Sequence, residues 1–200
     1  MERIARLNLV NCLGGAKPAN LIGTISNEEK TNLSIFNSVV HLGSNPALMG
    51  FIVRPPKEVR RHTYENVRQN GSFTINMVHP EFVRQAHYTS AKFEAEESEF
   101  EACGLTEEYV EGFSAPFVKE SKLKIGLQYL SEIPILINGT MLIIGQVEHV
   151  ILPDEVLFED NQIDLEKIEA VGIGGLNTYY NLEKIGYYPY ARKEDFRSSE

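Results

Sequence analysis

The chain has 200 residues, of which 42% are hydrophobic, 10% aromatic and 24% charged, a composition typical of one folded domain and unlike that of disordered or collagen-like chains. Its 19 Lys and Arg residues against 28 Asp and Glu residues give a formal net charge of -9, which repels nucleic-acid phosphates and anionic lipid surfaces. No apolar run approaches the about 20 residues of a transmembrane helix, and no signal-peptide pattern opens the chain, so we expect a cytoplasmic protein that binds neither nucleic acid nor membrane.

Alternation of hydrophobic and polar residues predicts a mainly β protein. We expect strands at 20–25, 32–40, 47–53, 73–77, 123–129, 135–137 and 141–150, with a hairpin turn at 27–30. Short and numerous strands usually close into a barrel or stack as a sandwich, because both arrangements protect the sheet edges. Since no Pro-, Gly- or Ser-rich linker divides the chain, we expect a single domain over residues 1–200.

Three short helices are predicted between or after these strands. Thr63 is expected to cap a helix that ends at Gly71, Pro80 to open a second helix, and Asp164 to precede a third. The residues expected to face inward are Phe82, Val83 and Ala86 in the second helix, and Leu165, Ile168 and Val171 in the third.

Several motifs suggest chemistry that their context does not support. The glycine-rich segment 172–177 lacks the third glycine and the βαβ context of a dinucleotide site, so we expect a loop there. The acidic run 94–101 lacks the Gly and Asn residues of a calcium loop, so we expect a solvated face. Cys12 and Cys103 are far apart, and no histidine pair has metal-ligand spacing, so we predict no metal site and no disulfide.

Three polar clusters remain, and each combines hydroxyl or amide groups with nearby cations. They are Asn32, Ser34 and Ser38 on one side of a strand, then Arg60, Arg61 and Thr63 at a helix start, and Thr89, Ser90 and Lys92 after another helix. A bound phosphate requires hydroxyls, backbone N–H groups at a helix start and one or two cations. The clusters could therefore converge on a phosphorylated heteroaromatic ligand, although helix caps and surface lysines also explain each cluster separately.

The order of these clusters along the chain adds a further indication. The relevant segments are 18–24, 32–39, 45–48, 61–67, 71–76, 89–93, 99–100, 104–105, 144–147 and 175–180. Together they resemble the flavin reductase-like family, which is built on the FMN-binding split barrel. The resemblance implies a mainly β fold, a closed Greek-key β-barrel with short flanking helices. It also implies a homodimer with the flavin near the subunit interface.

The same resemblance implies which residues bind the cofactor, here FMN. Those expected to line the isoalloxazine ring and ribityl chain are Asn32, Ser34, Asn37, Ser38 and Val39, and those expected at the phosphate are Arg61, Thr63, Ser90, Ala91 and Lys92. No catalytic residue is assigned, because the flavin itself carries the hydride chemistry and the protein only has to position it. Phe36 and Phe73 are expected in the barrel core.

One position departs from the family pattern. Many NAD(P)H-dependent reductases of this family carry a Gly-Asp-His segment before the glycine of a late strand, and the histidine serves the nicotinamide site. Thr140 stands in its place here, which leaves the use of NADH or NADPH open. The sequence thus supports three alternatives: an FMN-dependent reductase, a flavoredoxin-like electron carrier that serves an electron-acceptor protein or a monooxygenase, and a non-catalytic barrel that binds another small ligand.

Overall fold

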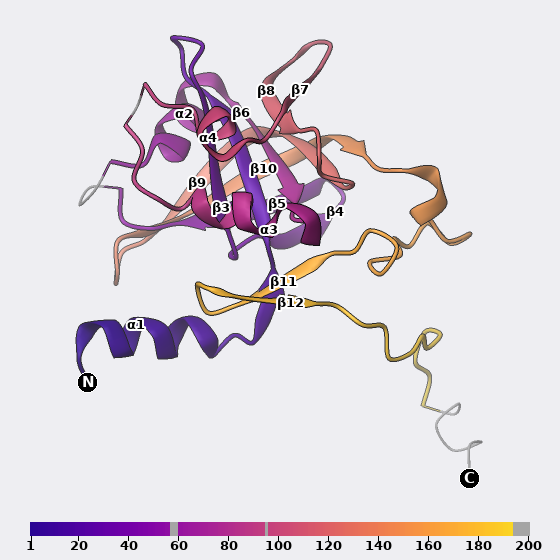
Figure 1. Ribbon diagram of the computed structural model, residues 1–200. Coiled ribbons are helices and arrows are strands. Elements are labelled where there is room, and N and C mark those ends of the chain that lie inside the picture. Colours follow the sequence, from indigo (N-terminus) through magenta and orange to yellow (C-terminus); the bar gives the residue numbers. More distant parts are fainter. Residues whose placement is uncertain (57–59, 95, 194–200) are drawn as a thin grey trace.

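The computed structural model describes residues 1–56, 60–94 and 96–193, which form a mainly β structure with short helices at its periphery (Figure 1). Its strands are β1 (Ala16–Pro18), β2 (Asn20–Ile25), β3 (Thr31–Phe36), β4 (Val40–Ser44), β5 (Ala47–Val53), β6 (Ser72–Met77), β7 (Glu107–Val110), β8 (Phe113–Val118), β9 (Lys124–Ile135), β10 (Thr140–Ile151), β11 (Val171–Gly174) and β12 (Thr178–Asn181). Its helices are α1 (Arg3–Cys12), α2 (His62–Asn70), α3 (Val83–Tyr88) and α4 (Glu99–Cys103), with 3-10 turns η1 (Pro80–Phe82) and η2 (Asp154–Val156). Among the described helices, none has the length and apolar character needed to span a membrane.

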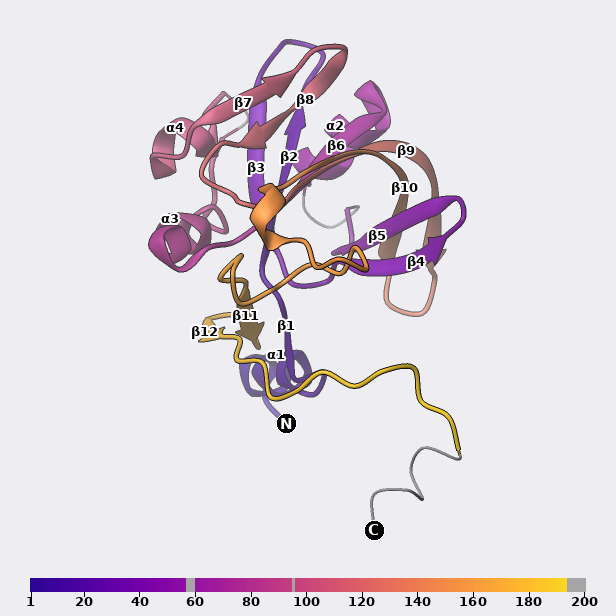
Figure 2. The same ribbon diagram turned by 90° about the vertical axis from the view of Figure 1, so that its right-hand side faces the viewer.

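Seven antiparallel strands form the central sheet in the order β3-β2-β6-β9-β10-β5-β4. The two edge strands, β3 and β4, are consecutive in the chain, and only residues 37–39 connect them. Seven strands in a flat sheet would separate the edges by about 29 Å, whereas so short a connection spans at most about 14 Å. The sheet must therefore curl until its edges approach each other, and Figure 2 shows this curvature in β9 and β10.

Aromatic contacts across the curled sheet confirm its shape. The ring centroid of Phe36 on β3 lies 5.0 Å from that of Phe51 on β5, although four strands separate β3 from β5 in the sheet order. Phe51 in turn contacts Phe73 on β6 at 5.3 Å. The interior cluster comprises Ile22, Phe51, Val53, Val67, Phe73, Ile75, Leu127 and Ile143, with Phe36 packed against it. The mainly β prediction is confirmed, while closure of the barrel stays a prediction because no ladder joins β3 to β4 in the described residues.

A second core lies between the sheet and the helices on its outer side. Its buried members are Ala19, Leu21, Leu33, Val78, Phe82, Ala86, Phe100, Leu105, Val118, Val171 and Ile173. The β7–β8 hairpin packs across β2 and β6 nearby, where Thr74 Oγ1 donates to the Pro116 carbonyl at 2.7 Å and Asn76 Oδ1 accepts from Val118 N at 2.9 Å. These buried polar contacts fix the hairpin over the sheet that carries the candidate site.

The segment after Asp164 is a turn rather than the predicted helix. Asp164 Oδ1 accepts from the backbone N–H groups of Glu166 and Lys167, as a helix cap would. Glu169 then adopts a φ of 57°, which ends the turn after a few residues, and Val171 already belongs to β11. The capping signal was therefore real, but the chain uses it for a single turn.

Several strand boundaries also differ from those predicted. The strand predicted at 32–40 ends at Phe36, because the chain must cross there from one sheet edge to the other. The separate strand predicted at 135–137 does not exist, since Ile135 ends β9 and a turn follows at 136–139. The segment predicted as a loop at 172–177 begins instead with the last three residues of β11, which pair with β1 and β12.

Candidate functional site

Alternate residues of β3 form the polar face of the candidate site. Asn32 and Ser34 point to the same side of the strand, as the two-residue period of a strand requires. The Asn32 amide is buried and donates to Thr63 Oγ1 at 3.0 Å and to Thr24 Oγ1 at 3.3 Å. In the described part of the chain no residue hydrogen-bonds to the Ser34 hydroxyl. This face therefore offers a ligand two groups, the Ser34 hydroxyl and the side-chain amide oxygen of Asn32.

The start of α2 adjoins this face. Arg61 is the N-cap residue, and its side chain makes no capping hydrogen bond, so the N–H groups of the first turn can bind an anion. Thr63, predicted as the cap, is instead the second helical residue, because the helix begins at His62. Its buried hydroxyl accepts from Asn32. Thus the structure brings Asn32, Arg61 and Thr63 to one corner.

The connection from β3 to β4 carries three further predicted residues. Asn37 Nδ2 donates to the Gly175 carbonyl at 2.8 Å, which links this connection to the turn between β11 and β12. The Ser38 hydroxyl both donates to and accepts from the backbone of Ile52, each at 3.1 Å. Val39 packs against the interior cluster. Ser38 thus extends the β4–β5 ladder, and its hydroxyl is already committed to the protein backbone.

The third predicted cluster follows α3 on the surface. The Ser90 hydroxyl donates to the His87 carbonyl at 2.7 Å, and Ser90, Ala91 and Lys92 are exposed. Within the described residues, no hydrogen bond or ion pair links Ser90 or Lys92 to β3. The structure therefore leaves the side chain of Lys92 in solvent and does not by itself join this cluster to the corner at Thr63.

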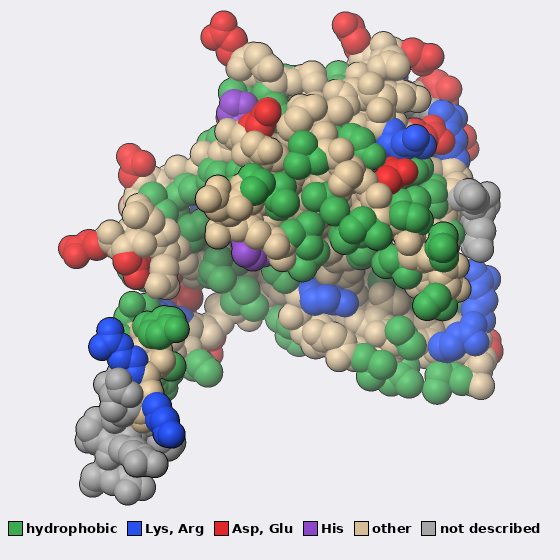
Figure 3. Space-filling view, turned by 180° about the vertical axis from the view of Figure 1, so that it is seen from behind, with side chains coloured by type: hydrophobic (Ala, Val, Ile, Leu, Met, Phe, Trp, Pro, Cys, Tyr) green, Lys and Arg blue, Asp and Glu red, His purple; other side chains and the backbone are tan. Residues whose placement is uncertain are grey.

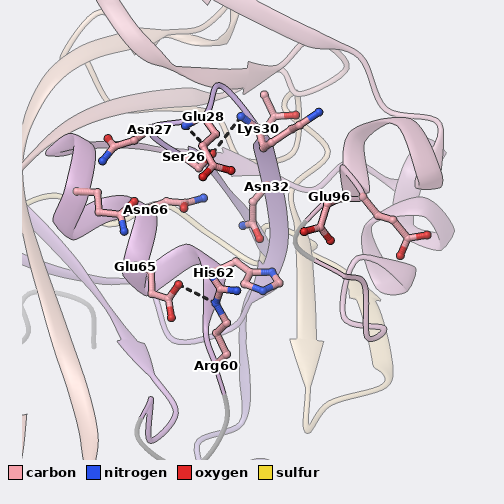
Figure 4. Close-up of a pocket in the computed structure, with 13 residues that line it drawn as sticks. Ser26, Asn27, Glu28, Lys30, Asn32, Arg60, His62, Glu65, Asn66 and Glu96 are labelled. Atoms are coloured by element: carbon pink, nitrogen blue, oxygen red, sulfur yellow. Dashed lines mark hydrogen bonds and ion pairs between the residues drawn. The ribbon is translucent and has the colours of Figure 1, made fainter.

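A pocket of about 240 Å³ opens beside that corner (Figure 4). Its lining comes from the β2–β3 hairpin, α2 and the segment before α4: Ser26, Asn27, Glu28, Lys30, Thr31, Asn32, Arg60, His62, Glu65, Asn66, Gln69, Glu96 and Glu97. Of the predicted site residues, only Asn32 lines this pocket. In Figure 4, Asn32 lies between Asn66 and Glu96.

The charge of the pocket restricts where a phosphate could bind. Carboxylates outnumber cations in the lining, and the Arg60 guanidinium is already paired with Glu65 at 2.9 Å. The pocket lining would therefore repel a phosphate, and the start of α2 is a more favourable place for a phosphate to bind. Small-molecule sites usually enclose about 300–1,000 Å³, so this pocket is too small to bury a whole mononucleotide.

Sequence reasoning missed some residues that support the site. Asn66 donates to Thr24 Oγ1 at 3.2 Å and so joins the network beneath Asn32. Its position three residues after Thr63 on one helix face could have indicated this. Glu99 accepts from the backbone N–H of Leu33 at 2.9 Å. No local signal distinguishes Glu99 from its acidic neighbours, because its partner lies far away in the sequence.

Comparisons with known proteins agree with this architecture. The chain is 48% identical to a protein of Shewanella frigidimarina described as a flavin reductase with a split barrel domain, with a TM-score of 0.91 over 96% of this chain and 94% of that one. Nitrilotriacetate monooxygenase component B from Bacillus cereus is 20% identical, with a TM-score of 0.85 over 94% and 95% of the two chains. A flavoredoxin of Desulfovibrio vulgaris (Miyazaki F) is 24% identical, with a TM-score of 0.77 over 88% and 92%.

The last two similarities concern the fold alone. The sequence pattern of the flavin reductase like domain, however, matches residues 14–166, which is most of the chain and includes every predicted site residue. This protein therefore belongs to the flavin reductase like domain family.

Proposed function

We propose that this protein is an FMN-binding oxidoreductase that transfers hydride or electrons through bound FMN, with NADH or NADPH as the electron donor. The observation that carries the proposal is the corner where Asn32 bonds to Thr63 beside the uncapped start of α2, in a chain of the flavin reductase like family. When bound, FMN would supply hydride and electron transfer through its isoalloxazine ring.

The donor set at this corner suits a flavin mononucleotide. Arg61 and the first-turn N–H groups of α2 would hold the phosphate, and Lys92 and Ser90 would complete its shell from the segment after α3. Ser34 would donate to the ribityl chain. The ring would lie against residues 37–39, where Asn37 keeps its amide oxygen for a ligand after donating to Gly175. These residues would hold the ring, and no protein acid or base is required.

We also propose that the protein is a homodimer. Helix α1 contains no buried residue, and its apolar side chains Ile4, Leu7, Leu9 and Val10 are all exposed. Figure 3 shows hydrophobic side chains along the lower edge of the molecule. A ten-residue helix that buries none of its own side chains is marginal in water, so a second copy would explain its stability. Sedimentation that shows only monomers at micromolar concentration would contradict this proposal.

A flavoredoxin-like electron carrier is the second candidate function. Thr140 lies at the start of β10, where its hydroxyl donates to Asn138 Oδ1 at 2.8 Å, and it cannot replace a histidine at a nicotinamide site. Such a carrier would pass electrons to an acceptor protein or to a monooxygenase. In either case we propose one domain over residues 1–200 and a cytoplasmic location. A non-catalytic barrel for another ligand is the third alternative.

Anaerobic mixing of the FMN-loaded protein with NADH or NADPH tests the first function. Rapid loss of the oxidised flavin absorbance with either nucleotide is expected for a reductase. Flavin that stays oxidised with both nucleotides, but is bleached by dithionite, would instead indicate the carrier. A protein that retains no FMN at all would contradict both and leave the non-catalytic barrel.

A further inference from the structure

Strand β3 is an edge strand of the central sheet, so one side of its backbone has no neighbouring strand. Unpaired backbone groups at such an edge must find other partners when they are buried. The N–H of Leu33 donates to Glu99 Oε2 at 2.9 Å. Glu99 is the first residue of α4 and is only 6% exposed, although it belongs to an acidic run that predicts a solvated face. Its carboxylate thus occupies the place of a missing strand.

A second contact holds β3 at Thr31, two residues before Leu33. The Thr31 hydroxyl donates to Glu107 Oε1 at 2.6 Å and lies 2.6 Å from the Ser98 hydroxyl. Ser98 directly precedes Glu99, and Glu107 belongs to β7. The edge of β3 is therefore held at both Thr31 and Leu33 by groups from α4 and β7.

The Thr31 contact lies on the face opposite the polar one, and the Glu99 contact lies at the edge between the two faces. Because side chains alternate along a strand, Thr31 and Leu33 point away from the side that carries Asn32 and Ser34. The Leu33 side chain is fully buried in the second core, which also contains Phe100 of α4. Because the edge and one face of β3 are held in this way, the position and the rotation of the polar face are fixed as well.

We propose that Glu99 is a positioning residue for the flavin site: its carboxylate holds the free edge of β3 and so keeps Asn32 and Ser34 in place for the cofactor. This inference rests on the proposed FMN function. It explains why a carboxylate stands at a buried position where an apolar residue would avoid the cost of desolvation. Burial raises the pKa of Glu99, and its hydrogen bond from Leu33 acts in the opposite direction.

The experiment compares the full-length variants Glu99→Ala, Glu99→Gln and Glu101→Ala. Hydrogen exchange of the Leu33 amide, measured without FMN, reports whether residue 99 holds the edge of β3. Titration with FMN measures the effect on the dissociation constant of the cofactor. We expect Glu99→Ala to speed exchange at Leu33 and to weaken FMN binding, each by about tenfold or more, because a buried backbone N–H is left without its acceptor. Glu99→Gln keeps an acceptor oxygen and should restore both values to within about threefold of wild type. The exposed Glu101 is the matched control and should change neither.

The outcomes separate this inference from the proposed function. Unchanged exchange at Leu33 in Glu99→Ala, or FMN affinity that stays equal to wild type, would overturn the positioning role. A Glu99→Gln variant as impaired as Glu99→Ala would also overturn it, since the role requires only an acceptor. Failure of the wild-type protein to bind FMN would contradict the proposed function, while the exchange result would still report whether Glu99 holds the edge of β3. If Glu99→Ala does not fold, Thr31→Val removes the neighbouring contact, and we expect faster exchange over residues 31–35 with several-fold weaker FMN binding.

Discussion

Simultaneous replacement of Arg61 and Lys92 by alanine should weaken FMN binding by about a hundredfold or more, because each charged hydrogen bond to a phosphate contributes about 1.5–3 kcal/mol. Riboflavin has the same ring and ribityl chain but no phosphate, so its dissociation constant should change by less than about threefold. Titrations of the variant with both ligands, followed by quenching of flavin fluorescence, measure the two constants. The chain contains no tryptophan, so protein emission interferes little.

Two other exposed cations provide the matched control for this experiment. Arg84 is exposed on α3, and Lys119 is exposed on the turn after β8. The double variant Arg84→Ala, Lys119→Ala removes the same net charge and should leave FMN affinity within about threefold of wild type, since exposed charges contribute little. Equal weakening of FMN and riboflavin by the Arg61 and Lys92 changes would refute the phosphate assignment.

Replacing Gly23 by alanine should destabilise the whole fold. A Cβ atom at this position of β2 would lie 2.3 Å from the Pro116 carbonyl oxygen of β8 and 2.6 Å from Thr74 Oγ1. This carbonyl belongs to the backbone and cannot rotate away, and it already accepts a hydrogen bond from the Thr74 hydroxyl. We expect a loss of about 3 kcal/mol or more in the free energy of unfolding, which for a chain of this size lowers the melting temperature by about 10 °C.

Gly43 is the matched control for this substitution. It also lies in a strand, β4, but a Cβ atom there would meet only the Pro46 carbonyl oxygen, at 3.8 Å, which is an ordinary contact. Gly43→Ala should therefore change the melting temperature by no more than a few degrees. Thermal unfolding followed by circular dichroism compares the two variants. If Gly23→Ala melts at the wild-type temperature, the close packing of the β7–β8 hairpin on β2 is wrong.

The parts of the fold that the sequence predicts well are those determined by local signals. The strand at Ala47–Val53 has the predicted bounds, because its apolar run is flanked by a turn and by a proline pair. Helix α2 ends before Gly71, which has the predicted left-handed φ of 70°. Phe73 is in the interior and Phe36 packs against it, as expected from the alternation of their strands.

The parts that the sequence does not predict depend on distant contacts. Glu99 resembles its exposed neighbours until Leu33 is brought beside it by the fold. Strand β8 contains Pro116, which argues against a central strand and is tolerated because, among the described strands, β8 pairs only with β7. Helix α1 was missed because its apolar residues form no buried stripe within one chain. The curvature of the sheet, which brings β3 to β4, is likewise a property of the whole chain.

A crystal structure of the protein with FMN at saturating concentration tests most directly whether the cofactor binds at the corner formed by Asn32, Arg61 and Thr63. We expect the phosphate at the start of α2, within hydrogen-bonding distance of Arg61 and Thr63, and the isoalloxazine ring against residues 37–39. A structure in which this corner stays without flavin, or in which the phosphate binds elsewhere, would contradict this expectation.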